Sequence, residues 1–484
     1  MTSAPKSGGL ANSRIAESPS APNVINGDVS FWWNQIGAPR PRAALTGDVS
    51  CDVCIVGGGY TGLWTAYYLK LLAPDCRVTV LEQRFSGYGA SGRNGGWLTN
   101  SITGGRDHFV AEFGRDLVGE WQRRVNETVD EVIAVCAREN IDADIVKGGE
   151  YTVAMNRAQQ LRLETWAQSE REWPMADAQL LSAAQARERI NIAETTGALW
   201  HPHAARIQPA KLARGLADLC ERLGVAIYEN TTVTHIAPGE ARSEHGTVRA
   251  DTVIRATEGF TANFSQSHRE WLPMNSSLVV TTPLSGSVWN DIGWSGRDVV
   301  GDMAHGYFYA QRTADDRIAI GGRGKPYRFG SKTDSDGSTH EQTIASLQSL
   351  LVRLFPVLGR HGTRPVLDHA WSGVLGVPRD WSATVGLDRR TGLAWAGGYV
   401  GTGVTSTNLA GRTLADLVLG RDTDITHLPW VNHRVRRWEV EPLRWVAVHA
   451  LYAMYGMADR SEARGRAGTS PLASLADAIS GRVH

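Results

Sequence analysis

The chain has 484 residues, enough for two or three domains of ordinary size and for a substantial hydrophobic core. Its 50 basic residues balance its 50 acidic residues, so no excess of positive charge favours binding to nucleic acid or to an anionic membrane. Five cysteines in so long a chain do not make a disulfide framework. No stretch has the ~20 apolar residues of a transmembrane helix, and no signal peptide is visible, so we expect a cytoplasmic protein.

The first regular elements follow a polar N-terminal stretch. Residues 1–28 are predicted to be a disordered tail, because serine, alanine and proline dominate this stretch and it has no apolar core. Residues 52–56 are a short apolar run that predicts a buried strand, residues 63–69 predict a helix, and residues 77–81 predict a second strand. These three elements form one β-α-β unit.

The turn between this first strand and the helix has the glycine spacing of a dinucleotide-binding loop. Gly57 permits a tight turn, Gly59 lets backbone amides approach a pyrophosphate, and Gly62 lets the helix pack closely against the strand. The N-terminus of the helix stabilises the phosphate charge. Glu82 follows the second strand, where a carboxylate can bind both ribose hydroxyls and disfavours a 2′-phosphate. The sequence therefore predicts a dinucleotide-binding site.

Two further glycine-rich stretches favour FAD over NAD. Residues 87–96 closely follow the acidic residue and would bring more backbone amides to a cofactor. Residues 395–404 end a strand and open a helix over 405–419, whose N-terminus can hold the partial negative charge of a reduced flavin. A pure NAD dehydrogenase needs neither loop, and ordinary surface loops would leave the glycines unexplained.

Helical and strand-rich stretches alternate through the rest of the chain. Helical patterns cover 108–140, 157–190 and 209–220, and strands are expected at 225–228 and within 270–323. This interleaving predicts an α/β fold, with a discontinuous Rossmann-like FAD-binding domain and an inserted antiparallel β-sheet substrate domain. We expect the FAD-binding domain over 29–145, 200–265 and 365–425, the substrate domain over 146–199 and 266–364, and a C-terminal helical extension over 426–484.

With these motifs the sequence resembles the D-amino-acid oxidase and glycine oxidase-like family of FAD-dependent oxidoreductases, and within it the bacterial γ-glutamylputrescine oxidase branch. The resemblance extends over about residues 30–430, and its most specific parts are residues 52–62, Gly-Ala-Ser-Gly-Arg-Asn-Gly-Gly at 89–96 and Gly-Gly-Tyr-Val-Gly-Thr-Gly-Val-Thr at 397–405. It implies oxidation of a C–N bond by hydride transfer to flavin N5. The resulting imine hydrolyses to an aldehyde or oxo acid plus an amine.

The resemblance also implies a small-molecule amine as substrate, first a γ-glutamylated amine such as γ-glutamylputrescine. N-alkyl amino acids and small amino acids are alternatives. A flavin monooxygenase is less favoured, because Gly301-Asp302 resembles the Gly-Asp motif of such enzymes but lacks the following proline. Sarcosine-oxidase-type relatives carry a lysine that promotes reaction with O₂, and residues 317–321 have none, so the acceptor is O₂ or another molecule.

The motifs and the resemblance give the residues expected to bind FAD. They are Gly57, Gly59, Tyr60, Thr61, Gly62, Glu82, Gln83, Ala90, Ser91, Arg93, Asn94, Gly95, Gly96, Val233, Ala256, Gly398, Tyr399, Gly401, Thr402, Gly403, Val404 and Thr405. FAD is expected to be non-covalent, since Arg93 and Asn94 occupy the loop where some relatives carry a linking histidine and no cysteine follows Cys220. No metal site is expected, because His201 and His203 lack further ligands at metal spacing.

Candidates for the substrate pocket are mostly aromatic residues of the inserted sheet. They are Tyr307, Tyr309, Trp371, Trp97, His305 and Arg317. Aromatic rings can enclose a substrate chain or stack on an ammonium group, although packing within the sheet is the alternative for each ring. Arg317, or Arg312 or Arg323 near it, can bind a substrate carboxylate, with a solvated strand edge as the alternative.

Residues 430–457 contain several tryptophans and tyrosines in an amphipathic helical pattern. Packing onto the protein's own domain is the simplest interpretation. A dimer contact or a membrane-surface contact is the alternative. We expect a monomer or a homodimer.

Overall fold

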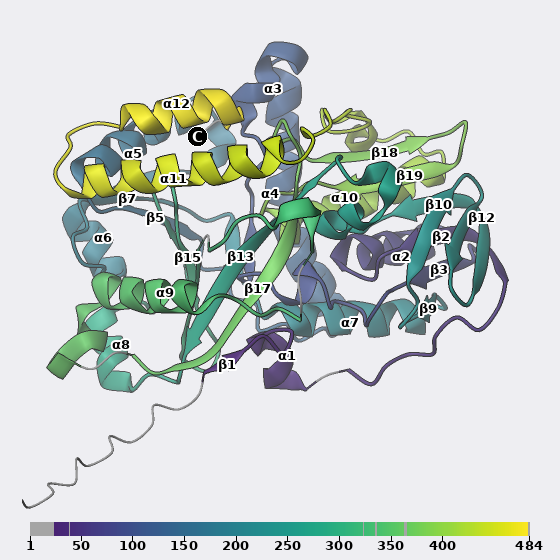
Figure 1. Ribbon diagram of the computed structural model, residues 1–484, viewed down its shortest axis with the longest axis horizontal. Coiled ribbons are helices and arrows are strands. Elements are labelled where there is room, and N and C mark those ends of the chain that lie inside the picture. Colours follow the sequence, from purple (N-terminus) through teal and green to yellow (C-terminus); the bar gives the residue numbers. More distant parts are fainter. Residues whose placement is uncertain (1–23, 38, 323, 334–335, 363–364, 483–484) are drawn as a thin grey trace, which may run out of the picture.

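Two large β-sheets organise the chain, and they lie on opposite sides of the molecule in Figure 1. The computed structural model describes residues 24–37, 39–322, 324–333, 336–362 and 365–482. Parallel and antiparallel strands are combined with helices packed on both sheets, which confirms the predicted α/β class.

The first sheet has eight strands and a parallel centre. Its path runs β10 (Val233–Ala237), β11 (Glu240–Ser243), β12 (Gly246–Arg255), β2 (Val49–Val56), β3 (Val78–Leu81) and β9 (Ala226–Tyr228), while β19 (Leu393–Gly397) pairs with β12 and β18 (Thr384–Asp388) with β19. Strands β9, β3, β2, β12 and β19 are mutually parallel. Parallel strands are covered on both faces, and Val53 and Ile55 of β2 accordingly pack in one core cluster while Cys54 and Val56 pack in another.

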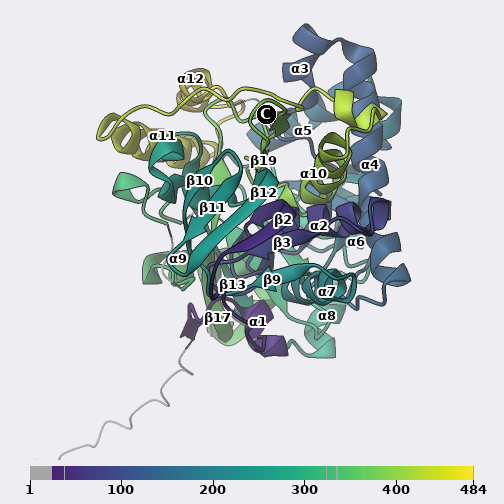
Figure 2. The ribbon, with the colours of Figure 1, turned by 90° about the vertical axis from the view of Figure 1, so that its right-hand side faces the viewer.

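Three helices cover one face of this sheet. They are α2 (Tyr60–Leu72), α7 (Pro209–Arg222) and α10 (Gly403–Val418), and Figure 2 shows them together beside β2, β3 and β9. Helix α2 contacts both of the others, and the side chains between them belong to the largest hydrophobic core. Because α2 and α10 both begin at the carboxyl ends of parallel strands, their N-termini lie at the same edge of the sheet.

The second sheet has nine strands and is mostly antiparallel. Its order is β1 (Ile25–Asn26), β17 (Leu367–Val377), β13 (Leu272–Thr281), β16 (Ile318–Gly322), β15 (Tyr309–Arg312), β14 (Val299–Asp302), β5 (Glu150–Ala154), β7 (Gly197–His201) and β6 (Gln179–Ser182). A short ribbon of β4 (Trp97–Thr99) and β8 (Ala204–Arg206) lies apart from it. Strand β17 falls in the segment 365–425 that we predicted to belong to the FAD-binding domain, yet it pairs with β13 from end to end. The division into domains otherwise stays a prediction.

The remaining helices flank the two sheets. They are α1 (Phe31–Ile36), α3 (Arg106–Phe113), α4 (Arg115–Arg138), α5 (Arg157–Glu170), α6 (Ala183–Arg189), α8 (Gly286–Ile292), α9 (Glu341–Leu354), α11 (Leu443–Ala463) and α12 (Pro471–Ser480). None of the helices in the described part of the chain is long and apolar enough to cross a membrane.

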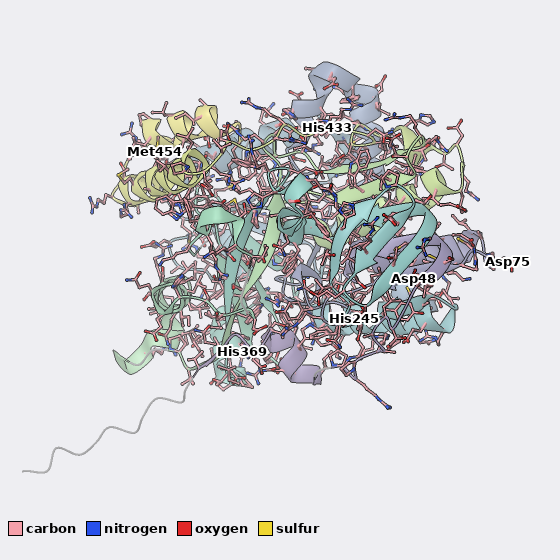
Figure 3. All side chains as sticks on the ribbon, turned by 45° about the vertical axis from the view of Figure 1, so that its right-hand side comes forward. Asp48, Asp75, His245, His369, His433 and Met454 are labelled. Carbon is pink, nitrogen blue, oxygen red and sulfur yellow. The ribbon has the colours of Figure 1, made fainter. Side chains whose placement is uncertain are left out.

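The N-terminal tail is shorter than predicted. Of the predicted tail 1–28, residues 1–23 lie outside the described residues, whereas β1 pairs with β17. His369 of β17, labelled in Figure 3, donates from Nε2 to the carbonyl oxygen of Gly27 at 2.7 Å. Burial lowers the pKa of His369. The prediction was wrong for residues 24–28, because pairing with a distant strand edge leaves no trace in local composition.

The C-terminal residues form a pair of helices that packs on the nine-stranded sheet. Figure 1 shows α11 and α12 side by side at the upper left, and Tyr455, Ala458, Ala473 and Ala476 make a small core between them. Glu462 of α11 forms ion pairs that reach α5 and the loop after β14.

Candidate active site

Two adjoining cavities lie between the sheets. The glycine-loop cleft has a volume of about 210 Å³ and follows the carboxyl ends of β2, β3 and β12. The aromatic cavity has a volume of about 310 Å³ and is bounded by β4, β5, β14 and β15. The two cavities share the lining residues Ala90, Asn94, Leu375, Gly401 and Val404. The two cavities are therefore direct neighbours, and molecules bound in them would lie on either side of these shared residues.

The glycine-loop cleft contains most of the residues predicted to bind FAD. Those that line it are Gly57, Gly59, Tyr60, Thr61, Glu82, Gln83, Ala90, Ser91, Asn94, Val233, Ala256, Tyr399, Gly401, Gly403 and Val404. Arg93, Gly95 and Thr402 line the aromatic cavity instead. Gly62, Gly96, Gly398 and Thr405 line neither cavity in the described structure.

The glycines of the first loop are required by close backbone contacts. Gly57 has a φ of +115°, and a Cβ there would lie 2.4 Å from the carbonyl oxygen of Ala256. A Cβ on Gly62 would lie 2.0 Å from the carbonyl oxygen of Gly57. Side chains at these positions would displace the turn. Gly62 does not line the cleft, but it shapes the cleft because it lets α2 approach β2 closely.

The cleft offers the groups that a dinucleotide needs. Helices α2 and α10 begin there, and neither N-cap residue makes a side-chain cap bond. The first N–H of α2, on Tyr60, donates to Ser91 Oγ at 2.8 Å, and N–H groups further along the first turns can bind phosphate or carbonyl oxygens. Glu82 lines the cleft, and its carboxylate accepts hydrogen bonds from the N–H of Gly58 at 2.8 Å and of Arg84 at 3.0 Å. Burial raises the pKa of Glu82. These residues fit FAD: α2 and Glu82 would hold its adenosine diphosphate, and the start of α10 its flavin.

Glu258 is a residue of the cleft that the sequence analysis missed. Its carboxylate accepts hydrogen bonds from the N–H of Gly376 at 3.1 Å and of Gly398 at 2.8 Å. It thereby ties the end of β12 to β17 and to the glycine turn after β19. Burial raises the pKa of Glu258 to about 7. The available signal was an acidic residue shortly after the apolar residues that form the end of β12. Its φ of +43° is not revealed by any local pattern.

Three of the predicted pocket residues line the aromatic cavity. They are Trp97, Tyr307 and Tyr309, and they are joined by Trp166 and Phe308, which we did not predict. The rings of Trp97 and Tyr309 meet edge to face, with centroids 6.2 Å apart. The Tyr309 hydroxyl and Ser276 Oγ are 2.7 Å apart, in hydrogen-bond contact. These contacts fix the walls of the cavity before a ligand arrives.

The other predicted pocket residues lie elsewhere. Trp371 is fully buried against α1 and donates from its indole nitrogen to the carbonyl oxygen of Arg93 at 2.8 Å. Arg317 pairs with Asp315 and Asp368 at the far end of β16. Arg312 pairs with Asp316, and Arg323 lies outside the described residues. The predictions for Trp371 and Arg317 were wrong. Trp371 shares the face of β17 with the lining residues Gly373 and Leu375 but lies farther along the strand, under α1, and Arg317 precedes β16.

His305 belongs to a buried ionic cluster beside the cavity, so the prediction that it lines the pocket was also wrong. Its Nε2 lies 3.0 Å from Glu462, and Asp459 accepts its backbone N–H. These three residues could in principle ligate a metal ion. However, Arg162 already lies 2.8 Å from Glu462. Burial opposes ionisation of Glu462, but the bonds from His305 and Arg162 prevail and lower its pKa to about 2. The cluster thus joins α11 to the nine-stranded sheet.

Comparisons with known proteins agree on one family. Residues 52–417 match the family model described as DAO, FAD dependent oxidoreductase. The chain is 31% identical over 435 residues to a γ-glutamylputrescine oxidoreductase of Escherichia coli (strain K12), an alignment that covers 87% of this chain and 95% of that protein. It is 22% identical over 400 residues to a sarcosine oxidase subunit beta of Rhodobacter capsulatus, covering 80% and 88% of the two chains.

Solved structures show the same fold. A glycine oxidase from Geobacillus kaustophilus superposes with a TM-score of 0.65 at 22% identity, over 80% of this chain and 99% of that one. An L-proline dehydrogenase from P. horikoshii superposes with a TM-score of 0.63 at 18% identity, over 81% and 96% of the two chains.

Proposed function

Because the chain belongs to the DAO family of FAD-dependent oxidoreductases, we propose that it oxidises an amine at its C–N bond, with FAD in the glycine-loop cleft and the amine in the aromatic cavity. The observation that carries this proposal is the junction between the two cavities. Five residues, Ala90, Asn94, Leu375, Gly401 and Val404, line both cavities, so an amine enclosed by the aromatic walls reaches the cofactor directly.

The chain's own part in this reaction is orientation and exclusion of water. FAD, when bound, supplies a hydride acceptor at N5, and the released imine hydrolyses to an aldehyde or oxo acid plus an amine. Trp97, Tyr307 and Tyr309 would hold the carbon chain of the substrate and stack on its ammonium group. The preformed cavity orients the amine, and the ammonium group that it binds must lose a proton before the neutral amine gives up the hydride. Nothing in this account requires a covalent bond to FAD, so we propose non-covalent binding.

For the substrate we propose a γ-glutamylated amine, with γ-glutamylputrescine as the first to test. The 31% identity to the γ-glutamylputrescine oxidoreductase, over nearly the full length of both chains, supports this choice. N-alkyl amino acids and small amino acids are the alternative, supported by the fold shared with glycine oxidase. The electron acceptor is O₂ or another molecule, and we propose a cytoplasmic monomer or homodimer.

The test is anaerobic reduction of the purified holoenzyme by a panel of amines, followed by readmission of air. We expect γ-glutamylputrescine to bleach the absorbance of oxidised flavin, and glycine or sarcosine to bleach it far more slowly. Fast recolouring with release of peroxide identifies an oxidase, and slow recolouring identifies a dehydrogenase that uses another acceptor. If no amine on the panel bleaches the flavin, the proposal fails.

A further inference from the structure

We infer that Glu150 makes the aromatic cavity selective for an ammonium group with no carboxylate beside it, as at the end of an alkyl chain, and that it excludes amino acids. The inference rests on the proposed function, because it names the class of amine that this cavity accepts. Glu150 was not singled out as a site residue from the sequence.

Glu150 is buried in the wall of the aromatic cavity. It is the first residue of β5 and is 8% exposed, and Thr152 of β5 and Gly301 of the neighbouring parallel strand β14 line the cavity from the same face. Asp302 pairs with Val153 on the opposite face, where Arg353 and Asp459 are its charged neighbours. Carboxylates are seldom buried to the extent of Glu150 unless a partner or a ligand stabilises them.

Glu150 is ionised but only partly satisfied. Its Oε2 accepts a hydrogen bond from the hydroxyl of Thr99 and lies 3.5 Å from Nε2 of His201. Burial opposes ionisation, but the contacts with His201 and Thr99 outweigh it and lower the pKa of Glu150. Within the described part of the chain, Oε1 has no hydrogen-bond donor. The Glu150 carboxylate therefore offers the cavity an acceptor oxygen to spare.

A charged ligand would meet Oε1 of Glu150 in the aromatic cavity. An arriving ammonium group would be stabilised by this carboxylate, whereas an arriving carboxylate would have to lie against it.

The single cationic side chain among the described lining residues does not offset this balance. Arg93 donates from Nε to the carbonyl oxygen of Tyr88 at 2.8 Å, and its guanidinium lies 4.3 Å from the centre of the Tyr88 ring. It also donates to the carbonyl oxygen of Ser372. Burial lowers its pKa. The protein thus engages Nε and Nη1, and the remaining Nη2 is itself buried, so the guanidinium does not present its planar pair of donors to a carboxylate in the cavity.

The experiment compares two ligands of equal shape and opposite charge on the FAD-loaded protein. tert-Butylammonium cannot be oxidised, because the carbon that bears its nitrogen has no hydrogen, and pivalate is its carboxylate counterpart. Binding is read from the perturbation of the flavin absorbance spectrum. We expect the wild-type protein to bind tert-butylammonium and to reject pivalate. Equal or tighter binding of pivalate would overturn the inference without any variant.

A variant then assigns the selectivity to Glu150. We expect Glu150→Gln to weaken tert-butylammonium binding by about 30-fold or more, the usual effect of removing one partner of a buried charge pair, and to admit pivalate. Glu164→Gln removes an exposed carboxylate of α5 and serves as the control of equal charge change. If Glu150→Gln binds the two ligands as the wild type does, the inference is wrong. If Glu150→Gln does not retain FAD, the wild-type comparison of tert-butylammonium with pivalate decides.

The outcomes separate this inference from the proposed function. Carboxylate-dependent binding of tert-butylammonium without bleaching by any amine would refute amine oxidation and leave the cavity's charge preference standing. Bleaching by amines together with equal binding of pivalate would refute the charge preference alone.

Discussion

At the scale of single residues, the glycine-loop cleft depends on contacts that allow no side chain. The distance of 2.0 Å between a Cβ on Gly62 and the carbonyl oxygen of Gly57 means that even alanine must push α2 away from β2. Such overpacking costs about 1–3 kcal/mol, and here the strain falls on the turn that meets the pyrophosphate.

We therefore expect Gly62→Ala to be purified with little FAD, as measured by the ratio of flavin absorbance to protein absorbance. Gly47→Ala is the matched control, because a Cβ on Gly47 meets no atom within 4 Å and its φ is not in the left-handed region. We expect the control to carry as much FAD as the wild type. A Gly62→Ala protein with full FAD content would contradict the assignment of this loop.

Glu258 gives a second residue-scale prediction, on pH. Burial raises the pKa of Glu258 from 4.5 to about 7, so the folded protein keeps a proton there that the unfolded chain releases. A raised carboxyl pKa costs stability as pH rises from about 4.5 to about 7. In the FAD-free protein we expect the wild-type unfolding free energy to fall across this window relative to Glu258→Gln, in urea titrations at several pH values. Parallel pH profiles would show that Glu258 does not titrate in this window.

The cavity carboxylate shows what the sequence can and cannot predict at this scale. Gly57, Gly59 and Glu82 were predicted because a strand, a turn and a helix define their site within one short segment. Glu150 belongs to the site only because β5 pairs with β14, about 150 residues away, and no local pattern reports that pairing.

At the scale of elements, the contact between α2 and α10 positions both helix N-termini at the cleft. Gly411 of α10 lies against α2, where a Cβ would meet Trp64 Cβ at 2.7 Å and Thr65 N at 2.8 Å. This contact sets the distance between the two helices, and it therefore sets the width of the cleft that their N-termini border.

We expect Gly411→Val to lower the unfolding free energy by about 1–3 kcal/mol through overpacking, measured by thermal or denaturant unfolding. Gly456→Ala in α11 is the contrasting variant, since the nearest atom to its Cβ is the flexible Arg460 side chain at 3.6 Å. Alanine in a helix interior should stabilise the protein there by up to about 1 kcal/mol. Equal effects of the two substitutions would contradict the close contact of α2 and α10.

Strand β17 marks the limit of element-scale prediction. Its residues read as strand from the sequence, but its partner β13 lies about 90 residues earlier, so the sheet to which it belongs could not be assigned. The wrong predictions for Trp371 and Arg317 have a related cause: the sequence does not show how far along a strand the cavity extends, and both residues lie beyond its lining.

At the scale of the whole molecule, buried charges fasten the C-terminal helices to the nine-stranded sheet. Glu462 is 1% exposed and pairs with both Arg162 and His305. Removal of one partner from a buried ion pair costs about 3–5 kcal/mol, because the other charge is left unpaired. We expect this loss of unfolding free energy for Glu462→Ala. The control, Glu439→Ala, breaks the more exposed pair with Arg379 and should cost no more than about 1 kcal/mol. Equal losses would show that the cluster does not hold α11 in place.

The account as a whole claims that an amine in the aromatic cavity gives its electrons to FAD in the glycine-loop cleft. The most direct test is an anaerobic titration of the holoenzyme with γ-glutamylputrescine, with the absorbance of oxidised flavin followed and the products identified. We predict complete bleaching at one equivalent of substrate per FAD, with an aldehyde and ammonia as products. No bleaching by an excess of this or any other amine, in a protein fully loaded with FAD, would contradict the account.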